Sequence, residues 1–241
     1  MPAAVRTALA IVLVTLAGVL GGFLSYRHTH PSAGPAGTLR TAPAAGAPLP
    51  DSASGAAPGE AGPAARPIPD TVPDLKLPDL AGQPRSLRDY RGHPLIINFW
   101  ATWCAPCRRE MPLLQQLRHS YSADGLQVVG VAVDFRSAVV DYVRRAPVDY
   151  PLLIGEDAGL AAAEQFGMQT VLPFSVFADA GGRIVAVKIG ELHPDEAAAI
   201  LAAMRELAAG RVSLADTHAG ISERLRQLAV ARARSGVKDP E

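Results

Sequence analysis

The stretch "HPLIINFWATWCAPCRREMPLLQQLRHSYS", residues 93–122, decides the fold. It begins with an apolar run of strand length, "HPLIINFWA". After the cysteines, Met111 and Leu114 begin a helical spacing of apolar residues that continues to the end of the stretch. Cys104 and Cys107, the two cysteines of the 241-residue chain, therefore lie where a buried strand passes into an amphipathic helix.

This junction predicts thiol chemistry for the cysteine pair. Cys104 is expected in the first turn of the helix, where unpaired N–H groups and the helix dipole favour a thiolate. A lowered pKa makes Cys104 the attacking sulfur. Cys107 lies one turn later on the same face and can resolve a mixed disulfide. Between them, Ala105 and Pro106 are small and stiff, which fixes the turn and leaves Cys104 open to a partner.

Other functions of a CxxC pair stay open. A structural disulfide would close a very short loop, so its stabilisation would be at the low end of about 2–4 kcal/mol. A zinc site needs two further ligands, and although His119 lies downstream, no second histidine follows at ligand spacing. Two thiolates could hold Cu(I), which makes a copper-handling binding protein the alternative from another functional class. No metal and no cofactor are predicted.

Strand and helix patterns alternate through the rest of the globular domain, up to residue 210. After the cysteine helix come a buried strand, a helix, a short strand or loop, and a second helix ending at a glycine. Two strands joined by "DAGG" and a last amphipathic helix follow. This order predicts an α/β fold with a mixed sheet. The successive segments are 126–134, 137–146, 151–156, 158–168, 173–178, 182–191 and 193–210.

Two motifs carry a resemblance to a known family. "WCAPC" at a strand–helix junction, followed about 70 residues later by "TVLPFSVF", resembles a thioredoxin-fold protein. The stretch "DLAGQPRSLRDYRGHPLIINFWATWCAPCRREMP" is similar to the membrane-anchored TlpA/ResA branch of thiol–disulfide oxidoreductases. The resemblance covers residues 72–209. It implies a thioredoxin-like fold with a short N-terminal hairpin, and a redox-active Cys104–Cys107 disulfide.

The same resemblance implies a proton-handling role for Glu110. In the ResA-like branch, the glutamate at this motif position exchanges protons with the cysteines. Thioredoxin itself has a buried aspartate where this chain has Asn98, and asparagine does not titrate. Glu110 is therefore the nearest carboxyl left for the work. The alternative is an exposed helix glutamate paired with an arginine.

Four further residues are expected to face the substrate. Pro173 matches the cis-proline that faces the cysteines in this fold, the alternative being an ordinary turn proline. Leu172, just before it, is expected to offer its backbone to an extended substrate segment. Trp103 and Pro106 are expected beside the cysteines at the same surface.

The N-terminal region predicts an anchor and a tether. Residues 7–24 form an uncharged run of 18 residues, about 27 Å as a helix and close to the ~30 Å hydrocarbon core. Because the sequence after it lacks a small-residue cleavage site, we expect an uncleaved anchor over 1–26 rather than a signal peptide. Residues 27–70 are rich in Pro, Ala and Gly and predict a disordered linker.

The remaining expectations concern domains, partners and place. The thioredoxin-like domain is predicted over 71–210 and a C-terminal tail over 211–241, where "ISERLRQLAVARARSG" has helical spacing. This tail could dock on the head, contact a membrane surface or stay solvated, and a solvated, partly helical tail is the default. With 23 basic and 23 acidic residues, nothing points to nucleic acid.

We therefore expect a single-pass inner-membrane protein with its catalytic domain in the periplasm. It would reduce protein disulfides, its own cysteines being re-reduced by a membrane electron-donor protein. The resemblance implies clients of the cytochrome c or oxidase copper-site maturation type. A disulfide oxidant or isomerase has the same residues and stays open.

Overall fold

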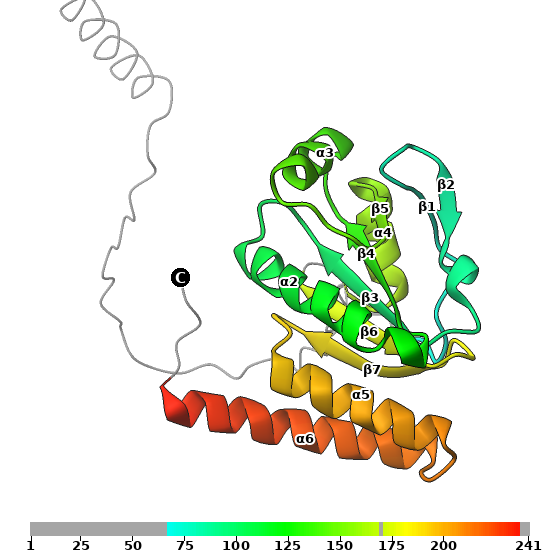
Figure 1. Cartoon of the computed structure of the whole chain (residues 1–241), viewed down its shortest axis with the longest axis vertical. Coiled ribbons are helices and arrows are strands. Elements are labelled where there is room, and N and C mark those ends of the chain that lie inside the picture. The colour runs from blue at the N-terminus through cyan, green and yellow to red at the C-terminus, as the bar shows by residue number, and fades with distance from the viewer. Residues whose placement is uncertain (1–66, 169–170, 237–241) are drawn as a thin grey trace, which may run out of the picture. The chain divides into compact units, whose positions relative to one another are not determined.

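The computed structural model describes residues 67–168 and 171–236, and its centre is a five-stranded mixed sheet (Figure 1). The strand order is β5-β4-β3-β6-β7. β3, β4 and β5 are parallel, whereas β6 runs antiparallel to β3 and β7 antiparallel to β6. The predicted mixed α/β sheet is therefore confirmed. The strands are β3 (Leu95–Trp100), β4 (Gln127–Ala132), β5 (Leu152–Ile154), β6 (Phe174–Ala178) and β7 (Ile184–Ile189).

The predicted N-terminal hairpin is also present. β1 (Lys76–Pro78) and β2 (Pro84–Ser86) pair antiparallel as a separate two-stranded sheet. A short 3-10 helix, η1 (Leu87–Tyr90), follows, and a capping box at Ser86 satisfies its first N–H groups. A second 3-10 helix, η2 (Ser122–Asp124), lies between the cysteine helix and β4.

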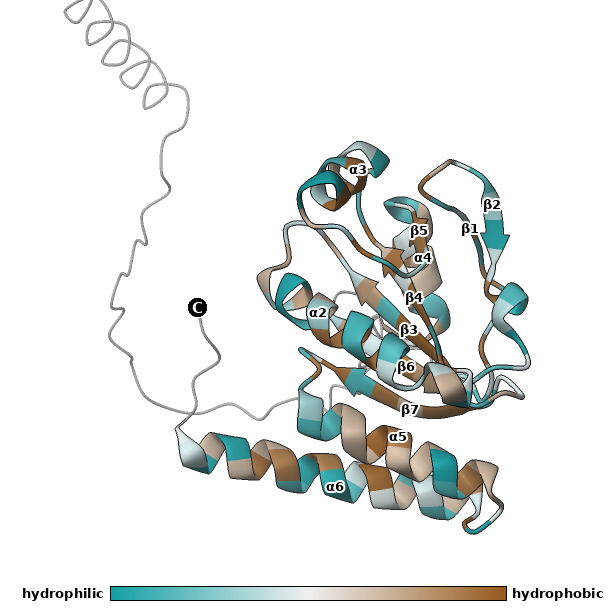
Figure 2. Ribbon diagram, in the orientation of Figure 1, coloured by the Kyte–Doolittle hydropathy of each residue, from teal (hydrophilic) through white to brown (hydrophobic). Residues whose placement is uncertain are grey.

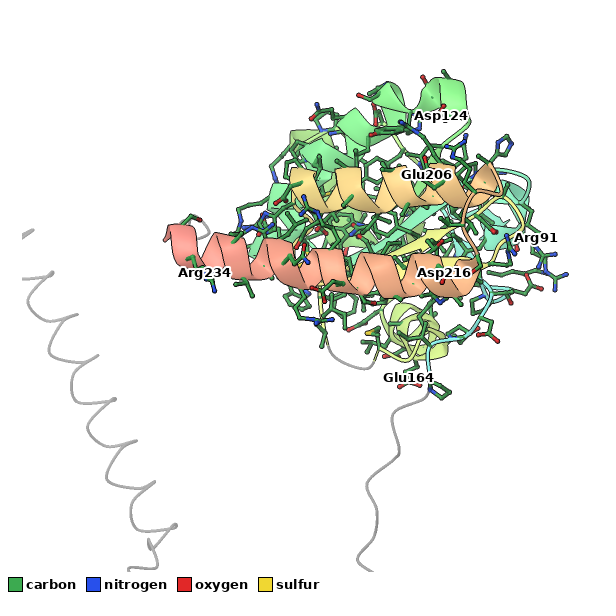
Figure 3. The ribbon with its side chains drawn as sticks, turned by 90° about the horizontal axis from the view of Figure 1, so that it is seen from below. Arg91, Asp124, Glu164, Glu206, Asp216 and Arg234 are labelled. Atoms are coloured by element: carbon green, nitrogen blue, oxygen red, sulfur yellow. A yellow bond between two sulfur atoms is a disulfide. The ribbon has the colours of Figure 1, made fainter. Side chains whose placement is uncertain are left out.

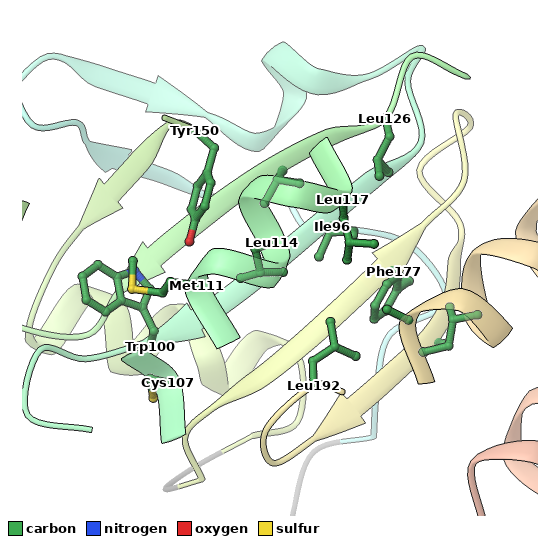
Figure 4. Packing of buried hydrophobic residues seen from close by; sticks show 14 of the residues in the cluster. Ile96, Trp100, Cys107, Met111, Leu114, Leu117, Leu126, Tyr150, Phe177 and Leu192 are labelled. Carbon is green, nitrogen blue, oxygen red and sulfur yellow. The ribbon is translucent and has the colours of Figure 1, made fainter. Parts of the chain in front are cut away.

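Two apolar clusters cover the two faces of the sheet. In Figure 2 the central strands are largely brown, whereas the helices mix brown and teal. On one face the core lies against helices α2, α3 and α5, and Figure 4 shows Trp100, Met111 and Tyr150 close together in it. On the other face it lies against α4 and the N-terminal hairpin. These helices span α2 (Ala105–Ser120), α3 (Arg136–Arg145), α4 (Asp157–Gln165) and α5 (Pro194–Ala208).

Within the described residues 211–236, the C-terminal tail forms a helix that docks on the domain. The expected helix is therefore confirmed, and the expectation that it is solvated was wrong. Helix α6 (Leu214–Ser235) runs back along α5 (Figure 3) and also contacts β7, the edge strand of the sheet. Ile221 is buried against the core, and His218 Nε2 lies 3.0 Å from the Ile184 carbonyl. Docking has a physical reason, because α6 covers the apolar edge that β7 would otherwise expose.

The predicted membrane anchor falls outside the described residues, as does the predicted linker up to residue 66. Across residues 67–168 and 171–236, no helix combines the length and the apolar character that crossing a membrane requires.

Candidate active site

The two cysteines lie at the junction that the sequence predicts. β3 ends at Trp100, and α2 begins at Ala105 with Cys104 as its N-cap residue. Cys104 and Cys107 are joined in a disulfide with their Cα atoms 5.3 Å apart. Cys107 is fully buried, whereas Cys104 keeps 6% of its surface exposed. Cys104 is therefore the sulfur that a partner reaches first.

The start of α2 provides a polar environment for Cys104. The backbone N–H of Cys107 donates to Cys104 Sγ at 3.3 Å. Pro106 lies in the first turn, where its missing N–H is no loss. No acidic residue occupies this turn. The N–H donor and the helix dipole both favour a thiolate at Cys104 once the disulfide is reduced.

A buried aspartate holds the loop in front of the cysteines. Asp134, just after β4, accepts hydrogen bonds from the Thr102 backbone N–H at 2.9 Å and from the Thr102 hydroxyl at 2.6 Å. Arg108 Nη1 donates to the Thr102 carbonyl at 2.7 Å. Sequence reasoning missed Asp134. The feature that could have predicted it is a single aspartate just after a buried strand, β4, which pairs in parallel with β3.

Glu110 is buried, with 1% of its surface exposed, so the alternative of an exposed helix glutamate is excluded. Asn98 Nδ2 donates to Glu110 Oε1 at 2.7 Å, and the Leu192 N–H donates to Oε2 at 2.6 Å. Burial raises the pKa of Glu110 to about 7, although these two hydrogen bonds act to lower it. The carboxyl can therefore gain or lose a proton near neutral pH.

Asn98 is suited to either protonation state of Glu110. Its Nδ2 also donates to Ser175 Oγ at 3.0 Å, while its Oδ1 has no hydrogen-bond partner among the described residues. The oxygen and nitrogen of an amide are assigned from the surrounding network. Rotation of the Asn98 amide would present Oδ1 to the carboxyl proton of a neutral Glu110.

The arginines that follow Cys107 do not pair with Glu110. Arg109 instead forms a two-pronged ion pair with Glu191, with N–O distances of 2.5–3.2 Å. The Glu191 charge acts to raise the pKa of Glu110, and the Arg109 guanidinium lies against that charge. Leu192, Glu191 and Ser175 all belong to segments distant in sequence, and sequence reasoning found none of them.

The expected substrate-facing residues come from two segments. The Leu172–Pro173 peptide bond is cis, as the resemblance implies, and the Pro173 carbonyl accepts from the Gly190 N–H at 2.9 Å. Leu172 is half-buried and packs against both core clusters. Trp103 is 68% exposed, so most of its ring faces solvent beside Cys104.

Comparison with known proteins identifies relatives of the domain that contains this site. The model of the AhpC/TSA family matches residues 68–187. The thiol-disulfide oxidoreductase ResA of Geobacillus kaustophilus is 32% identical over 127 residues, which cover 52% of this chain and 71% of that protein. The chain belongs to the TlpA/ResA-like thiol–disulfide oxidoreductases. It is therefore a thiol:disulfide oxidoreductase that acts on protein disulfides.

One further relative matches a shorter part of the chain, and a solved structure matches a part similar in length to the ResA match. The thioredoxin-like protein YneN of Bacillus subtilis is 52% identical over 67 residues, 28% of this chain and 38% of that protein. The solution structure of a putative thioredoxin from Neisseria meningitidis has a TM-score of 0.50 and 30% identity, covering 57% of this chain and 91% of that one. Both matches support the thioredoxin-like fold that the sequence predicts.

Proposed function

We propose that this chain is a membrane-tethered reductant of extracytoplasmic protein disulfides. Residues 1–26 would anchor it in the inner membrane, 27–70 would be the linker, 71–210 the thioredoxin-like domain in the periplasm, and 211–241 the C-terminal tail. The support is the uncharged 18-residue run at 7–24 and the Pro-, Ala- and Gly-rich composition after it.

In the proposed reaction, the Cys104 thiolate attacks one sulfur of a client disulfide. The client S–S bond breaks, one client sulfur leaves as a thiolate, and the other joins Cys104 in a mixed disulfide. Cys107 then attacks Cys104 Sγ, which forms the Cys104–Cys107 disulfide and releases the second client thiolate. Two electrons pass to the client, and the enzyme ends oxidised.

Glu110 would manage the proton of Cys107. The single observation that carries this role is the buried Glu110 carboxyl, with a pKa raised to about 7, one helical turn from Cys107. At neutral pH part of the Glu110 population is ionised and can accept the Cys107 proton as that sulfur attacks. Asn98 can bond to both forms of Glu110, because its Nδ2 donates to the ionised carboxylate and its Oδ1 can accept from the protonated carboxyl.

The direction of the reaction depends on how strongly the reduced pair is stabilised. A strong oxidant owes its potential to a highly stabilised thiolate. Here one backbone N–H, that of Cys107, donates to Cys104 Sγ among the described residues. The Glu110 carboxyl lies one turn from Cys107, where its charge opposes a second thiolate. This balance favours a reductant.

The family resemblance suggests which proteins this chain reduces and which kind of protein re-reduces it. Apocytochrome c cysteines or the cysteines of an oxidase copper site would be reduced by Cys104. A membrane electron-donor protein would re-reduce the pair. Trp103 and the backbone of Leu172 beside Pro173 would receive the client segment.

Trapping of mixed disulfides tests this function. Cys107→Ser leaves the attacking sulfur but removes the resolving one, so we expect it to accumulate covalent, dithiothreitol-sensitive adducts with extracytoplasmic cysteine proteins. Cys104→Ser is the matched control and should accumulate far fewer, because its remaining sulfur is fully buried. Equal trapping by both variants, or none by Cys107→Ser, would disprove the assigned roles.

A further inference from the structure

A row of polar side chains crosses the sheet from the active site. Asn98 on β3 lies opposite Ser175 on β6, and Ser175 lies opposite Lys188 on β7. Residues directly opposite each other on antiparallel strands project to the same face of the sheet. Asn98 contacts Glu110 of α2, so all three side chains project to the α2 side. The row thus leads from Glu110 to Lys188.

At its far end this row connects to the C-terminal helix through Glu196 of α5. Lys188 Nζ lies 3.5 Å from Glu196 Oε2 of α5, and its side chain is only 15% exposed. The other oxygen of the buried Glu196 accepts from Arg232 of α6 at 3.3 Å, and Arg232 also pairs with Asp195 at 3.0 Å. Glu196 is therefore shared between a cation on β7 and a cation on α6.

The charged and titratable groups around Glu110 come from three other segments. Lys188 on β7 acts to lower the pKa of Glu110, and Glu191 in the following loop acts to raise it. Glu191 is itself paired with Arg109, a neighbour of Glu110 on α2. Tyr150, before β5, is neutral at physiological pH, and burial raises its pKa further above the ordinary value of 10.0. Lys188 thus places a positive charge on the sheet side of Glu110.

We propose that Lys188 is a positioning residue for the proton chemistry of Glu110, and that helix α6 sets its strength through Arg232. Arg232 offsets part of the Glu196 charge, which leaves more of the Lys188 charge to act on Glu110. This inference rests on the role proposed for Glu110, and it assigns a task to a helix that lies beyond the family match at residues 68–187.

If Lys188 and Arg232 act through their charges, each substitution should shift the titration midpoint of Glu110 in the direction set by the charge that it removes, which loss of packing alone would not produce. Opposite charges favour the ionised carboxyl and like charges disfavour it. Lys188→Met should therefore move the titration midpoint of Glu110 up, by about 0.5 pH unit or more. Arg232→Gln should move it up by less, because its charge acts through Glu196. Glu196→Gln removes a negative charge and should move the midpoint down.

The direct measurement is carboxyl carbon NMR of the oxidised full-length chain labelled at glutamate. The Glu110 signal is assigned by its loss in Glu110→Gln, and the pH profile of disulfide exchange is recorded alongside. Arg226→Gln is the matched control on α6, since Arg226 pairs with Glu223 on the same helix, 2.7 Å away. It should leave the Glu110 midpoint unchanged.

The outcomes separate this inference from the proposed function. If the midpoint stays in place in Lys188→Met and Glu196→Gln, or moves the same way in both, the coupling is disproved. If Lys188→Met does not fold, the opposite shifts in Arg232→Gln and Glu196→Gln decide. If the midpoints move as predicted while the exchange profile does not, the coupling stands and the catalytic role of Glu110 fails.

Discussion

Removing the Glu110 carboxyl should change how the stability of the oxidised protein depends on pH. The ordinary pKa of glutamate is 4.5, and the buried carboxyl has a pKa of about 7. The folded state therefore binds this proton more tightly than the unfolded state does. The resulting stabilisation is fully present below pH 4.5 and is lost as the pH rises through about 7.

The magnitude follows from the two pKa values. A difference of about 2.5 units corresponds to about 3.4 kcal/mol at 1.36 kcal/mol per unit. About 2.5 kcal/mol of this is lost between about pH 5 and about pH 8.5. Glutamine carries no such proton, so Glu110→Gln should lose this part of the pH dependence and gain stability over the wild type at the higher pH.

Urea denaturation of both proteins at the two pH values measures the effect. The disulfide is kept oxidised throughout, and the free energy of unfolding is obtained by linear extrapolation. Every other titrating group is common to both proteins, so the difference between the two pH dependences isolates Glu110. Identical pH dependence in the wild type and Glu110→Gln would refute the reasoning.

Three further substitutions test the packing around the site, each read from urea denaturation. Ile221→Ala on α6 should lower the free energy of unfolding by about 2–5 kcal/mol, because it leaves a cavity at a buried position. Val230→Ala is the control, because Val230 is exposed on the same helix, and it should cost less than about 0.5 kcal/mol. Equal losses would argue against docking of α6. Asp134→Ala should cost about 1–3 kcal/mol, because it leaves the half-buried N–H and hydroxyl of Thr102 without their acceptor. It should also slow disulfide exchange, and an unaltered exchange rate would contradict its role. Gly130→Ala should lower the free energy of unfolding by about 1–3 kcal/mol, because its Cβ would lie 2.6 Å from a leucine side chain of β5. An unchanged free energy would show that this side chain moves aside without loss of stability.

The sequence was sufficient for the parts of the site that are local. A strand-length apolar run before Cys104 and helical spacing after Cys107 predicted the junction, because both patterns lie within 30 residues. The position of Glu110 was also local, since three residues from Cys107 means the same face of one helix, but its proton-handling role came from the family resemblance. The cis bond at Pro173 required the family resemblance.

The partners of Glu110 could not be predicted because they come from distant segments. Chain reversal brings the Leu192 N–H to Glu110. Strand register places Ser175 and Lys188 in the row that begins at Asn98. Register is a property of paired strands and is not written in either strand alone. The buried environment that raises the pKa of Glu110 therefore became visible only in the structure.

The docking of α6 was missed for a related reason. Its apolar spacing predicted a helix, but the arginines along it are typical of a solvated surface. In the structure Arg232 is instead paired with Asp195 and Glu196 at the start of α5. Those partners lie more than 30 residues away, so the sequence offered no means of distinguishing a docked helix from a solvated one.

The reduction potential of the Cys104–Cys107 pair tests the central claim most directly. The chain is equilibrated against glutathione or dithiothreitol at neutral pH, and the oxidised fraction is followed by thiol alkylation. A reductant of protein disulfides should have a potential near or below about −220 mV. A value near about −120 mV, as for strong oxidants, would contradict the proposed direction of electron flow.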